Sequence, residues 1–452
     1  MQINEKKIKI INENVPKEML KLVSIVKEKY PDNEKLVRMF EKGLVNTYQT
    51  TINKDDNGET FIITGDIPAM WNRDSVAQVR PLLLVANESE EIKNILRGII
   101  QIHKKQIMID PYANAFNRTP GSVGDHCDDL THMDPMVWER KYEIDSLCYP
   151  IQLAYFYWKV TGDTTIFDTQ FNQMVNQIIN TFMIEQHHHE KSPYSFRRIA
   201  DWLLFEEPAR LEFESLNNNG KGAPVGYTGM TWSGFRPSDD ACKYGYLVPA
   251  NMFAVVILGY LEEIYGEFYN NNEQLKVITK LKNEINNGIE TYGIIDHPDY
   301  GKMYAYEVDG LGKTHLMDDA NVPSLLSACY LGYCGVNDEV YQNTRRFILS
   351  KDNPYFYEGK VAKGVGSPHT PPEYIWHIAL AIQGMTTESL EEKQEIMDTF
   401  LKSDAGTDLM HEGFHVDNPD NFTRPWFSWA NSMFAEFVLN TIDMKVIDEV
   451  KK

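Results

Sequence analysis

Two adjacent carboxylates, Asp239 and Asp240, follow Trp232 and Arg236 in the segment GMTWSGFRPSDD, and an apolar segment comes after them. An aromatic ring can stack on the C–H face of a sugar, while carboxylate and guanidinium groups bond its hydroxyls. A neighbouring carboxylate and an apolar wall both raise the pKa of a carboxyl group, which prepares it to act as an acid. The segment therefore predicts either a saccharide site with acid–base chemistry or a helix start capped by aspartate.

Glycoside hydrolysis needs a second carboxyl group on the opposite side of the scissile bond. Glu412, in the polar segment MHEGFH, lies between His411 and His415 and is the candidate. One carboxyl of the Asp239–Asp240 pair would carry the proton and Glu412 would face it, provided that the fold brings them together. A separation of about 6.5–9.5 Å between the two carboxyl groups would indicate inversion, whereas about 5 Å would indicate retention.

Six loops share this mixture of carboxylates, aromatic residues and Pro or Gly, and each precedes an apolar helical segment. They are residues 65–75, 132–146, 229–240, 315–324, 364–376 and 411–432. One such aspartate is typical of a helix cap, but six loops of the same character favour a binding site for an uncharged polyol. The phosphate-binding patterns GxxxxGK[ST] and GxGxxG are absent from the sequence, so a nucleotide is not the expected ligand.

Helical periodicity dominates the elements that must position these loops. Residues 142–160 are apolar almost all round, which predicts a buried helix, and Gly162 ends it before an amphipathic helix. The same pairing recurs at 247–265 with 271–288, and at 373–384 with 389–401. Strand signals are few: residues 58–65 predict one strand, and a hairpin is expected near 292–308.

Six loops that each open the inner helix of a helical hairpin predict an all-α (α/α)6 barrel, in which the loops meet at one end. The barrel has six inner and six outer helices, with loop and short β-hairpin insertions. Because low-complexity linkers are lacking, residues 1–452 are predicted to form a single catalytic domain.

Composition excludes several classes of protein. The net charge of -21 argues against nucleic acid and anionic membranes as partners, because both require concentrated Lys and Arg. The charged N-terminus lacks a signal-like apolar segment, no stretch reaches the roughly 20 apolar residues of a membrane span, and the five cysteines are scattered. These features predict a cytoplasmic protein with free thiols. The segment 124–134 holds His and Asp residues but lacks zinc-site spacing, so neither a metal nor a cofactor is expected.

Taken together, several long motifs closely resemble glycoside hydrolase family 125. They are TGDIPAMWNRDS, DPYANAFN, WERKYEIDSLCYPI, GMTWSGFRPSDDACKYGYLVPANMFA, LMDDANVPSLL, GVGSPHTP and HEGFHVDNP with FTRPWFSWANSMFAE. They occur in the family's order over residues 40–440. The resemblance implies an (α/α)6 barrel, removal of non-reducing terminal mannose from α-1,6 linkages with inversion, and no required metal.

Carried over motif by motif, the resemblance places the general acid in RPSDD, with Asp239 preferred to Asp240, and the general base at Glu412. It also implies a set of mannose-binding residues. Trp232, Arg236 and Asp240 of the segment 229–240 are added to that set. The expected substrate-binding residues are Asp66, Trp71, Arg73, Asp74, Glu139, Arg140, Glu143, Asp145, Trp232, Arg236, Asp240, His369 and Arg424.

Two alternatives from other classes stay open. A sugar epimerase or isomerase on the same barrel would use paired histidines, for which His315, His369 and His411 are candidates. A glycan-binding protein would keep the aromatic residues but need no matched acid and base. The expected partner is a mannose-containing oligosaccharide or N-glycan fragment, and the protein is expected to be a monomer or a weak homo-oligomer.

Overall fold

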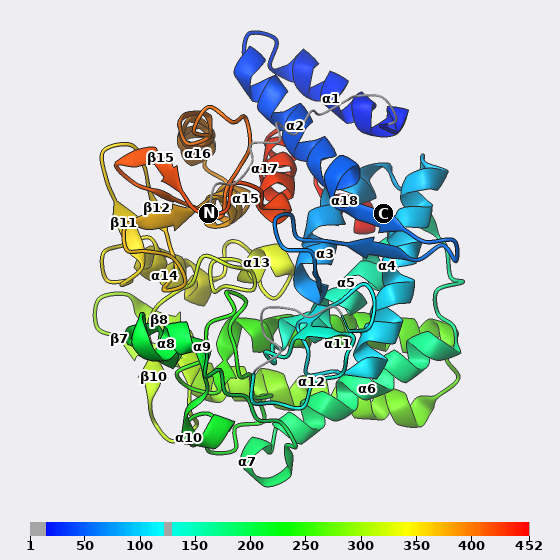
Figure 1. Ribbon diagram of the computed structural model, residues 1–452, viewed down its shortest axis with the longest axis vertical. Helices are drawn as coiled ribbons and strands as arrows, with labels where there is room; N and C mark the ends of the chain where they lie inside the picture. The colour runs from blue at the N-terminus through cyan, green and yellow to red at the C-terminus, as the bar shows by residue number, and fades with distance from the viewer. Residues whose placement is uncertain (1–14, 122–128, 452) are drawn as a thin grey trace.

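Helices in two layers make up most of the computed structural model, which describes residues 15–121 and 129–451 (Figure 1). Along the described chain, outer and inner helices alternate, as the predicted (α/α)6 barrel requires. The inner helices are α3 (Asn72–Val79), α5 (Asp145–Thr161), α11 (Val248–Phe268), α13 (Ala328–Leu331), α15 (His377–Met385) and α17 (Ser428–Thr441). The outer helices are α2 (Glu34–Thr50), α4 (Glu90–Ile109), α6 (Thr169–Glu185), α12 (Asn272–Gly288), α14 (Glu339–Ile348) and α16 (Leu390–Lys402).

Neighbouring inner helices pack side by side around the ring. Helix α3 contacts α5 and α17, α5 contacts α11, α11 contacts α13, and α15 contacts α17. Every residue of α3 is buried, whereas the outer helix α12 buries only one face. The all-round apolar segments of the sequence therefore form the inner layer, because a helix between other helices has no face toward water.

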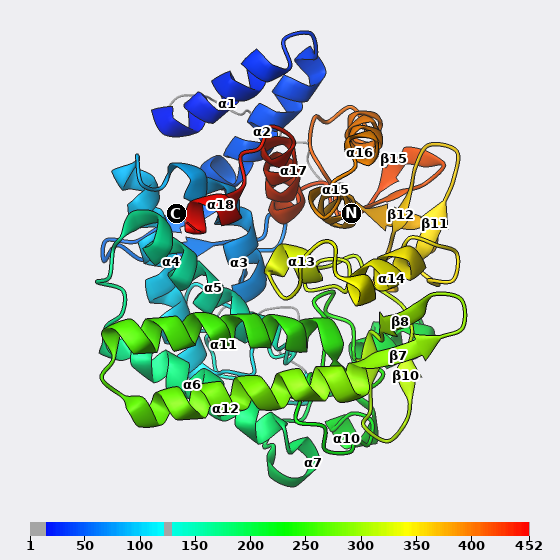
Figure 2. The same ribbon diagram turned by 180° about the vertical axis from the view of Figure 1, so that it is seen from behind.

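Helix α11 is, among the described helices, the one that is long and apolar enough to cross a membrane. Most of that stretch is buried, because α11 packs against α5 on one side and α12 on the other. Figure 2 shows α11 and α12 running side by side across the back of the barrel. In this structure α11 is a core helix of the barrel wall.

The two layers begin in different ways. The outer helices all start at a residue whose side chain accepts a hydrogen bond from the first turn: Asn33, Ser89, Asp168, Asn271, Asp338 and Ser389. The described inner helices start without such a side-chain cap. In particular, α11 begins at Val248, well past Asp239 and Asp240. The helix-cap interpretation of this aspartate pair is therefore wrong.

Three small antiparallel sheets join the loops in front of the inner helices. One contains β3 (Met70–Trp71), β4 (Ala115–Phe116) and β5 (Val137–Glu139) and links the loops 65–75 and 132–146. The second contains β6 (Tyr246–Leu247), β9 (Glu307–Val308) and β10 (Thr314–His315), and the third contains β13 (Tyr374–Trp376), β14 (Gly413–His415) and β15 (Asn418–Phe422). Two-stranded pairs complete the strands: β1 (Ile52–Lys54) with β2 (Thr60–Ile62), β7 (Ile294–His297) with β8 (Gly301–Tyr304), and β11 (Phe356–Glu358) with β12 (Lys363–Val365).

The strand prediction over 58–65 and the hairpin prediction near 292–308 are confirmed by β2 and by β7–β8. The strands of the three loop-joining sheets were not predicted. Most of them have two or three residues, which is too short for an alternating pattern to appear.

Shorter elements complete the described chain. Helix α1 (Lys17–Lys29) packs on α2 at the top of Figure 1, outside the barrel. The rest are α7 (His188–Lys191), α8 (Asp201–Phe205), α9 (Leu211–Glu214), α10 (Asn217–Gly220), α18 (Val446–Val450), the 3-10 turns Arg80–Val85 and Pro208–Arg210, and the π turn Ile289–Gly293. His126 and Cys127, in the segment weighed as a metal site, lie outside the described residues. Within the described residues, no group of three His, Cys, Asp or Glu side chains could hold a metal ion.

Candidate active site

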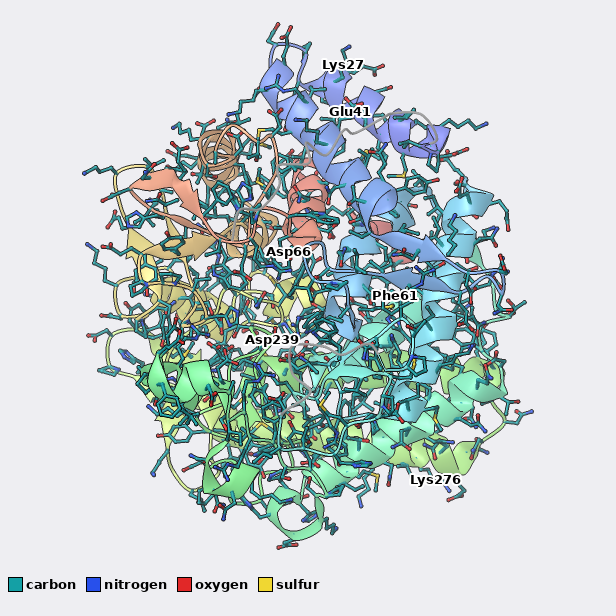
Figure 3. The ribbon with its side chains drawn as sticks, in the orientation of Figure 1. Lys27, Glu41, Phe61, Asp66, Asp239 and Lys276 are labelled. Carbon is teal, nitrogen blue, oxygen red and sulfur yellow. The ribbon has the colours of Figure 1, made fainter. Side chains whose placement is uncertain are left out.

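A cavity of about 400 Å³ opens where the six loops meet, at the N-terminal ends of the inner helices. Each loop contributes to its lining, for example through Trp71, Glu139, Asp239, Asn321, His369 and Glu412. Figure 3 shows Asp66 and Asp239 near the middle of the view, while Lys27 and Lys276 lie toward the edge. A larger hollow of about 1300 Å³ is lined by the C-terminal halves of the inner helices and contains neither Asp239 nor Glu412. The smaller cavity is therefore the candidate active site.

Adjacent aspartates of the loop 229–240 have different surroundings. The Asp239 side chain is 24% exposed and lines the cavity, whereas the Asp240 side chain is fully buried. Both aspartates belong to a tight turn over residues 236–240. In this turn the Asp239 amide donates to the Arg236 carbonyl (2.9 Å) and the Arg236 amide donates to the Asp240 carbonyl (2.8 Å). Asp239 adopts a left-handed backbone with φ of 68°, a conformation that costs free energy in residues other than glycine and is frequent at functional sites.

Three groups hold Asp239 in place. Arg73 Nη2 lies 3.3 Å from Asp239 Oδ1, and Asn114 Nδ2 donates to the same oxygen at 3.1 Å. Lys141 Nζ donates to the Asp239 carbonyl at 2.7 Å. These contacts fix both the backbone and one carboxylate oxygen of Asp239, and Asp239 still keeps part of its side chain open to the cavity.

Glu412 lies on a different wall of the cavity, next to Arg424. Arg424 Nη1 lies 3.6 Å from Glu412 Oε1, while its Nε and Nη2 atoms bond Asp66 at 3.0 Å and 2.5 Å. The guanidinium carbon lies 4.2 Å from the centre of the Phe427 ring, and the Arg424 backbone is left-handed with φ of 49°. Asp66 and Phe427 therefore orient Arg424 toward Glu412, whose side chain is only 9% exposed.

A buried charged cluster forms the base of the cavity around Arg73. Arg73 Nη1 contacts Glu143 Oε2 at 2.5 Å and Asp145 Oδ2 at 3.2 Å, and Arg73 Nε lies 3.3 Å from Asp74 Oδ1. Burial raises the pKa of Asp74 and of Asp145 to about 6 each, even though the positive charge of Arg73 opposes the shift. Burial also raises the pKa of Glu143 well above its usual range. Burial thus raises the pKa of three carboxyl groups that share one guanidinium group.

A second charged network supports the wall that carries Glu139. Arg198 Nη2 contacts Glu139 Oε1 at 2.8 Å, Arg198 Nη1 contacts Glu214 Oε2 at 3.1 Å, and Lys141 Nζ contacts Glu214 Oε2 at 2.9 Å. Burial alone would raise the pKa of Glu214, but Lys141 and Arg198 lower it well below its usual range. Asn114 Nδ2 also donates to Glu139 Oε2 at 2.9 Å, so Asn114 connects this wall to Asp239.

His369 lines the cavity and pairs with the buried Asp240, with 3.0 Å between His369 Nδ1 and Asp240 Oδ1. Burial by itself would lower the pKa of His369, but Asp240, with Glu412 and Glu214 nearby, raises it to about 9. His369 is therefore a cation at neutral pH, and Asp240 supports it from behind the cavity wall.

Seven of the thirteen residues expected to bind substrate do not line this cavity. Four of them bond residues that do line it: Asp66, Asp240, Glu143 and Asp145. The other three are Arg140, Arg236 and Trp232. Arg140 bonds Asp110 at 2.6 Å, and Arg236 bonds Glu307 at 2.6 Å, where it supports the loop from below. Trp232 is buried, and its ring stacks 3.5 Å from that of His188. Each of these three side chains has a partner inside the protein and lies outside the lining of this cavity, so their contact with the sugar stays a prediction.

The histidine run at residues 187–189 contributes to the packing around Trp232. His188 is buried, its Nδ1 atom lies 2.5 Å from Glu185 Oε2, and its Nε2 atom lies 2.9 Å from the Lys221 carbonyl. Only part of this histidine run is solvent-facing, because His188 fills the space beside Trp232.

Three charged residues of the cavity wall were not predicted from the sequence: Lys141, Arg198 and Glu214. Asn114 was not predicted either; it does not line the cavity but bonds Glu139 and Asp239. Alternation of side chains along a strand could have predicted Lys141. Lys141 follows β5 directly and lines the cavity together with Glu139, whereas Arg140, between them, does not. Asn114 lies in the DPYANAFN motif but was assigned no role. Arg198 and Glu214 lie outside the six loops, and nothing in the local sequence distinguishes them from other surface charges.

The histidines of the epimerase alternative do not share a site. Of the three, only His369 lines the cavity. His315 lines a separate pocket with Arg236 and Tyr355, and His411 is fully buried with its ring 3.8 Å from that of Phe422. Burial lowers the pKa of His411 to about 4. The described residues therefore offer no histidine pair for proton transfer at one sugar carbon.

Comparison with known proteins agrees with this geometry. A family model described as metal-independent alpha-mannosidase (GH125) matches residues 33–439. The Meiotically up-regulated gene 157 protein of Schizosaccharomyces pombe is 40% identical over 441 residues, which cover 93% of this chain and 84% of that protein. A structure from Streptococcus pneumoniae, described as a metal-independent alpha mannosidase in a non-productive complex with alpha-1,6-mannobiose, has 46% identity and a TM-score of 0.91 over 95% of this chain and 99% of that one.

More distant structures share only the barrel. One described as a wild-type glycosidase has 11% identity and a TM-score of 0.53, covering 92% of this chain and 99% of that one. The family match spans all six loops, including Asp239 and Glu412 of the cavity. The chain therefore belongs to glycoside hydrolase family 125, the metal-independent α-mannosidases.

Proposed function

We propose that the protein is an exo-α-1,6-mannosidase that removes a non-reducing terminal mannose with inversion, using Asp239 as general acid and Glu412 as general base. The observation that carries this proposal is that the two carboxylates, far apart in the sequence, line one cavity. The α-1,6 linkage is supported by the disaccharide bound to the similar Streptococcus pneumoniae protein.

The dimensions of the cavity suit the end of a glycan. Its volume of about 400 Å³ is near the lower end of the range for small-molecule sites, about 300–1,000 Å³. Trp71, Trp376 and Trp429 contribute aromatic walls against which a pyranose ring can stack. One terminal sugar would fill the cavity while the remainder of the glycan extends into solvent, which is the condition for exo action.

In the proposed reaction, the Asp239 proton passes to the glycosidic oxygen as the bond between that oxygen and C1 breaks. Glu412 removes a proton from a water molecule, and the water oxygen bonds C1 from the opposite face of the ring. The transition state resembles an oxocarbenium ion, which nearby carboxylates stabilise. The products are β-mannose and the shortened glycan, and one water molecule is consumed.

The remaining cavity residues are proposed to hold the sugar hydroxyls. Asp74, Glu139, His369 and Arg424 line the cavity beside the two catalytic carboxylates, and Trp71 offers a stacking surface. We assign Asp66, Asp240, Glu143 and Asp145 a supporting part, because Asp66 bonds Arg424, Asp240 bonds His369, and the other two bond Arg73.

Proton NMR of α-1,6-mannobiose incubated with the protein tests this function. The expected result is that the β-anomer of mannose appears first and then mutarotates. If α-mannose appears first, the mechanism retains configuration, and the proposed base is wrong. Binding without cleavage would identify a glycan-binding protein, and an altered sugar in an intact disaccharide would identify an epimerase.

The sequence predictions of a cytoplasmic location and of a monomer or weak homo-oligomer belong to the same proposal. Light scattering after size-exclusion chromatography, at two concentrations of the full chain, tests the oligomeric state. Cell fractionation with an antibody to the protein tests the location.

A further inference from the structure

We propose that Glu143 shares one proton with Asp239 and holds the proton of the acid catalyst between turnovers. This inference rests on the proposed function of Asp239. Glu143 does not line the cavity, so it acts through Asp239 and is a positioning residue rather than a catalytic one.

The contacts of Glu143 leave one of its oxygens buried without a hydrogen-bond partner. Its side chain is fully buried, and Oε2 accepts hydrogen bonds from Arg73 Nη1 at 2.5 Å and from Ser146 Oγ at 2.9 Å. The other oxygen, Oε1, is buried without a donor in reach. Arg73 brings Glu143 and Asp239 together, because its Nη1 atom lies 2.5 Å from Glu143 and its Nη2 atom lies 3.3 Å from Asp239. Two ionised carboxylates in contact repel each other, whereas a single proton between them makes a hydrogen bond.

The charge balance around Arg73 leads to the same conclusion. The cluster contains one guanidinium group and four acids, Asp74, Glu143, Asp145 and Asp239. The other cations nearby have carboxylate partners of their own. Arg424 pairs with Asp66 and Glu412, and Lys141 pairs with Glu139 and Glu214. Burial raises the pKa of Glu143 well above its usual range, Arg73 opposes this, and Asp239 and Asp145 reinforce it. We place the proton of the pair on Glu143 when the cavity contains no sugar, because the Glu143 side chain is fully buried while the Asp239 side chain is 24% exposed.

Arg73 allows the proton to lie on either acid. It contacts Glu143 through Nη1 and Asp239 through Nη2, so a negative charge on either carboxylate has the same cation beside it. When the proton moves from Glu143 to Asp239, the resulting Glu143 carboxylate keeps its bonds from Arg73 and Ser146. Asp239 then carries a proton at the moment when the glycosidic oxygen must accept one.

The proton balance closes over one turnover. Asp239 gives its proton to the leaving oxygen, and both members of the pair are then ionised. Glu412 takes one proton from the attacking water and releases it to solvent. The Glu143–Asp239 pair takes one proton from solvent, so the enzyme is restored and only water is consumed.

The Glu143→Gln variant tests the inference with two substrates. The Gln amide can donate to Asp239 but cannot give up a proton, so it holds Asp239 in the ionised form. With α-1,6-mannobiose we expect kcat/KM to fall by roughly 10²–10⁴-fold, the usual contribution of a general acid. With α-mannosyl fluoride, whose leaving group needs little protonation, kcat/KM should stay within about threefold. The alkaline limb of the mannobiose pH profile should also move to lower pH.

Asp145→Asn is the matched control, because Asp145 is equally buried and accepts from the same Arg73 Nη1 atom. Its effect should be the same on both substrates. Equal losses on both substrates for Glu143→Gln, or no loss on either, would overturn the inference. Failure of the wild-type protein to hydrolyse either substrate would instead refute the proposed function.

Infrared spectroscopy of the wild-type protein keeps the inference testable if the Gln variant does not fold. At neutral pH we expect the C=O band of a buried protonated carboxyl group, and Asp239→Asn should shift that band because it changes the hydrogen-bond acceptor. Absence of the band, or a band unaffected by Asp239→Asn, would contradict a shared proton.

Discussion

Asp239 receives hydrogen bonds from side chains of two neighbouring cavity walls, Arg73 and Asn114, and a third from Lys141 to its carbonyl. These contacts restrict its rotation without closing it off from the cavity. A general acid must lie within hydrogen-bond reach of the atom that it protonates, and rigid placement reduces the entropy lost in reaching the transition state. In the proposed mechanism the supporting residues therefore contribute to catalysis by positioning Asp239, which is the proton donor.

Asp239→Asn should abolish acid catalysis and leave the fold intact. Asparagine has the same shape and tolerates a left-handed backbone, so the thermal midpoint should change little. We expect kcat for α-1,6-mannobiose to fall by roughly 10²–10⁴-fold, whereas α-mannosyl fluoride should be hydrolysed at a similar rate. Equal losses on both substrates would assign Asp239 a different role.

Glu412→Gln should give the complementary result. Water must be deprotonated whatever the leaving group, so activity on the disaccharide and on the fluoride should fall together, by roughly 10²–10⁴-fold. Steady-state kinetics with both substrates measure this directly. A variant that keeps full activity on the fluoride would show that Glu412 is not the base.

The helices of the two layers depend on different interactions. Each outer helix begins with a side-chain cap, a local signal worth about 0.5–2 kcal/mol, while the described inner helices lack one and depend on burial. Three inner helices directly follow a short strand, β3, β6 or β13. Those strands occupy the place where a capping turn would lie, so the backbone can extend into the loops of the cavity.

Removing an outer cap should therefore destabilise the protein without affecting catalysis. Asp338 accepts a hydrogen bond from the Tyr341 amide at 2.9 Å at the start of α14. Asp338→Ala should lower the free energy of unfolding by about 1 kcal/mol, measured by urea denaturation, with kcat unchanged. Asp420→Ala, at an exposed position in β15, is the control and should have little effect. A changed kcat with unchanged stability would contradict the separation of the two layers.

At the scale of the whole molecule, hydrophobic periodicity was enough to predict the barrel. All-round apolar segments such as 142–160 become inner helices, and the loops before them meet because consecutive hairpins close into a ring. The cavity carboxylates that lie in these loops, Asp74, Glu139, Asp239 and Glu412, were predictable for the same reason, whereas Glu214 lies outside the loops and was not predicted. Periodicity does not report the direction of a single side chain in an irregular segment, so Arg140 was chosen in place of Lys141, and Trp232 was expected to contact sugar.

The stability of the molecule should depend on pH through the His369–Asp240 pair. Folding raises the pKa of His369 from 6.5 to about 9, so the folded state binds this proton more tightly than the unfolded state. The resulting stabilisation is fully present below about pH 6.5 and is lost as the pH rises through about 9. The urea midpoint of His369→Gln should therefore lie further below that of the wild type at pH 6.5 than at pH 9.5. An equal gap at both pH values would contradict the ion pair.

The three small sheets divide the ring of loops into three units, each joining two neighbouring loops. Asp239 precedes the sheet of β6, β9 and β10, whereas Glu412 adjoins β14 in another sheet. No strand pairing in the described chain joins these two sheets, although His369, from the loop before β13, contacts Asp240 at 3.0 Å. The distance between Asp239 and Glu412 therefore depends on this pair and on how the helices beneath the two sheets pack. A change of side-chain volume deep in the barrel would change the distance between Asp239 and Glu412 without altering the residues around either carboxyl group. In the proposed mechanism, inversion at C1 therefore depends on the packing of the barrel helices as well as on the two carboxyl groups.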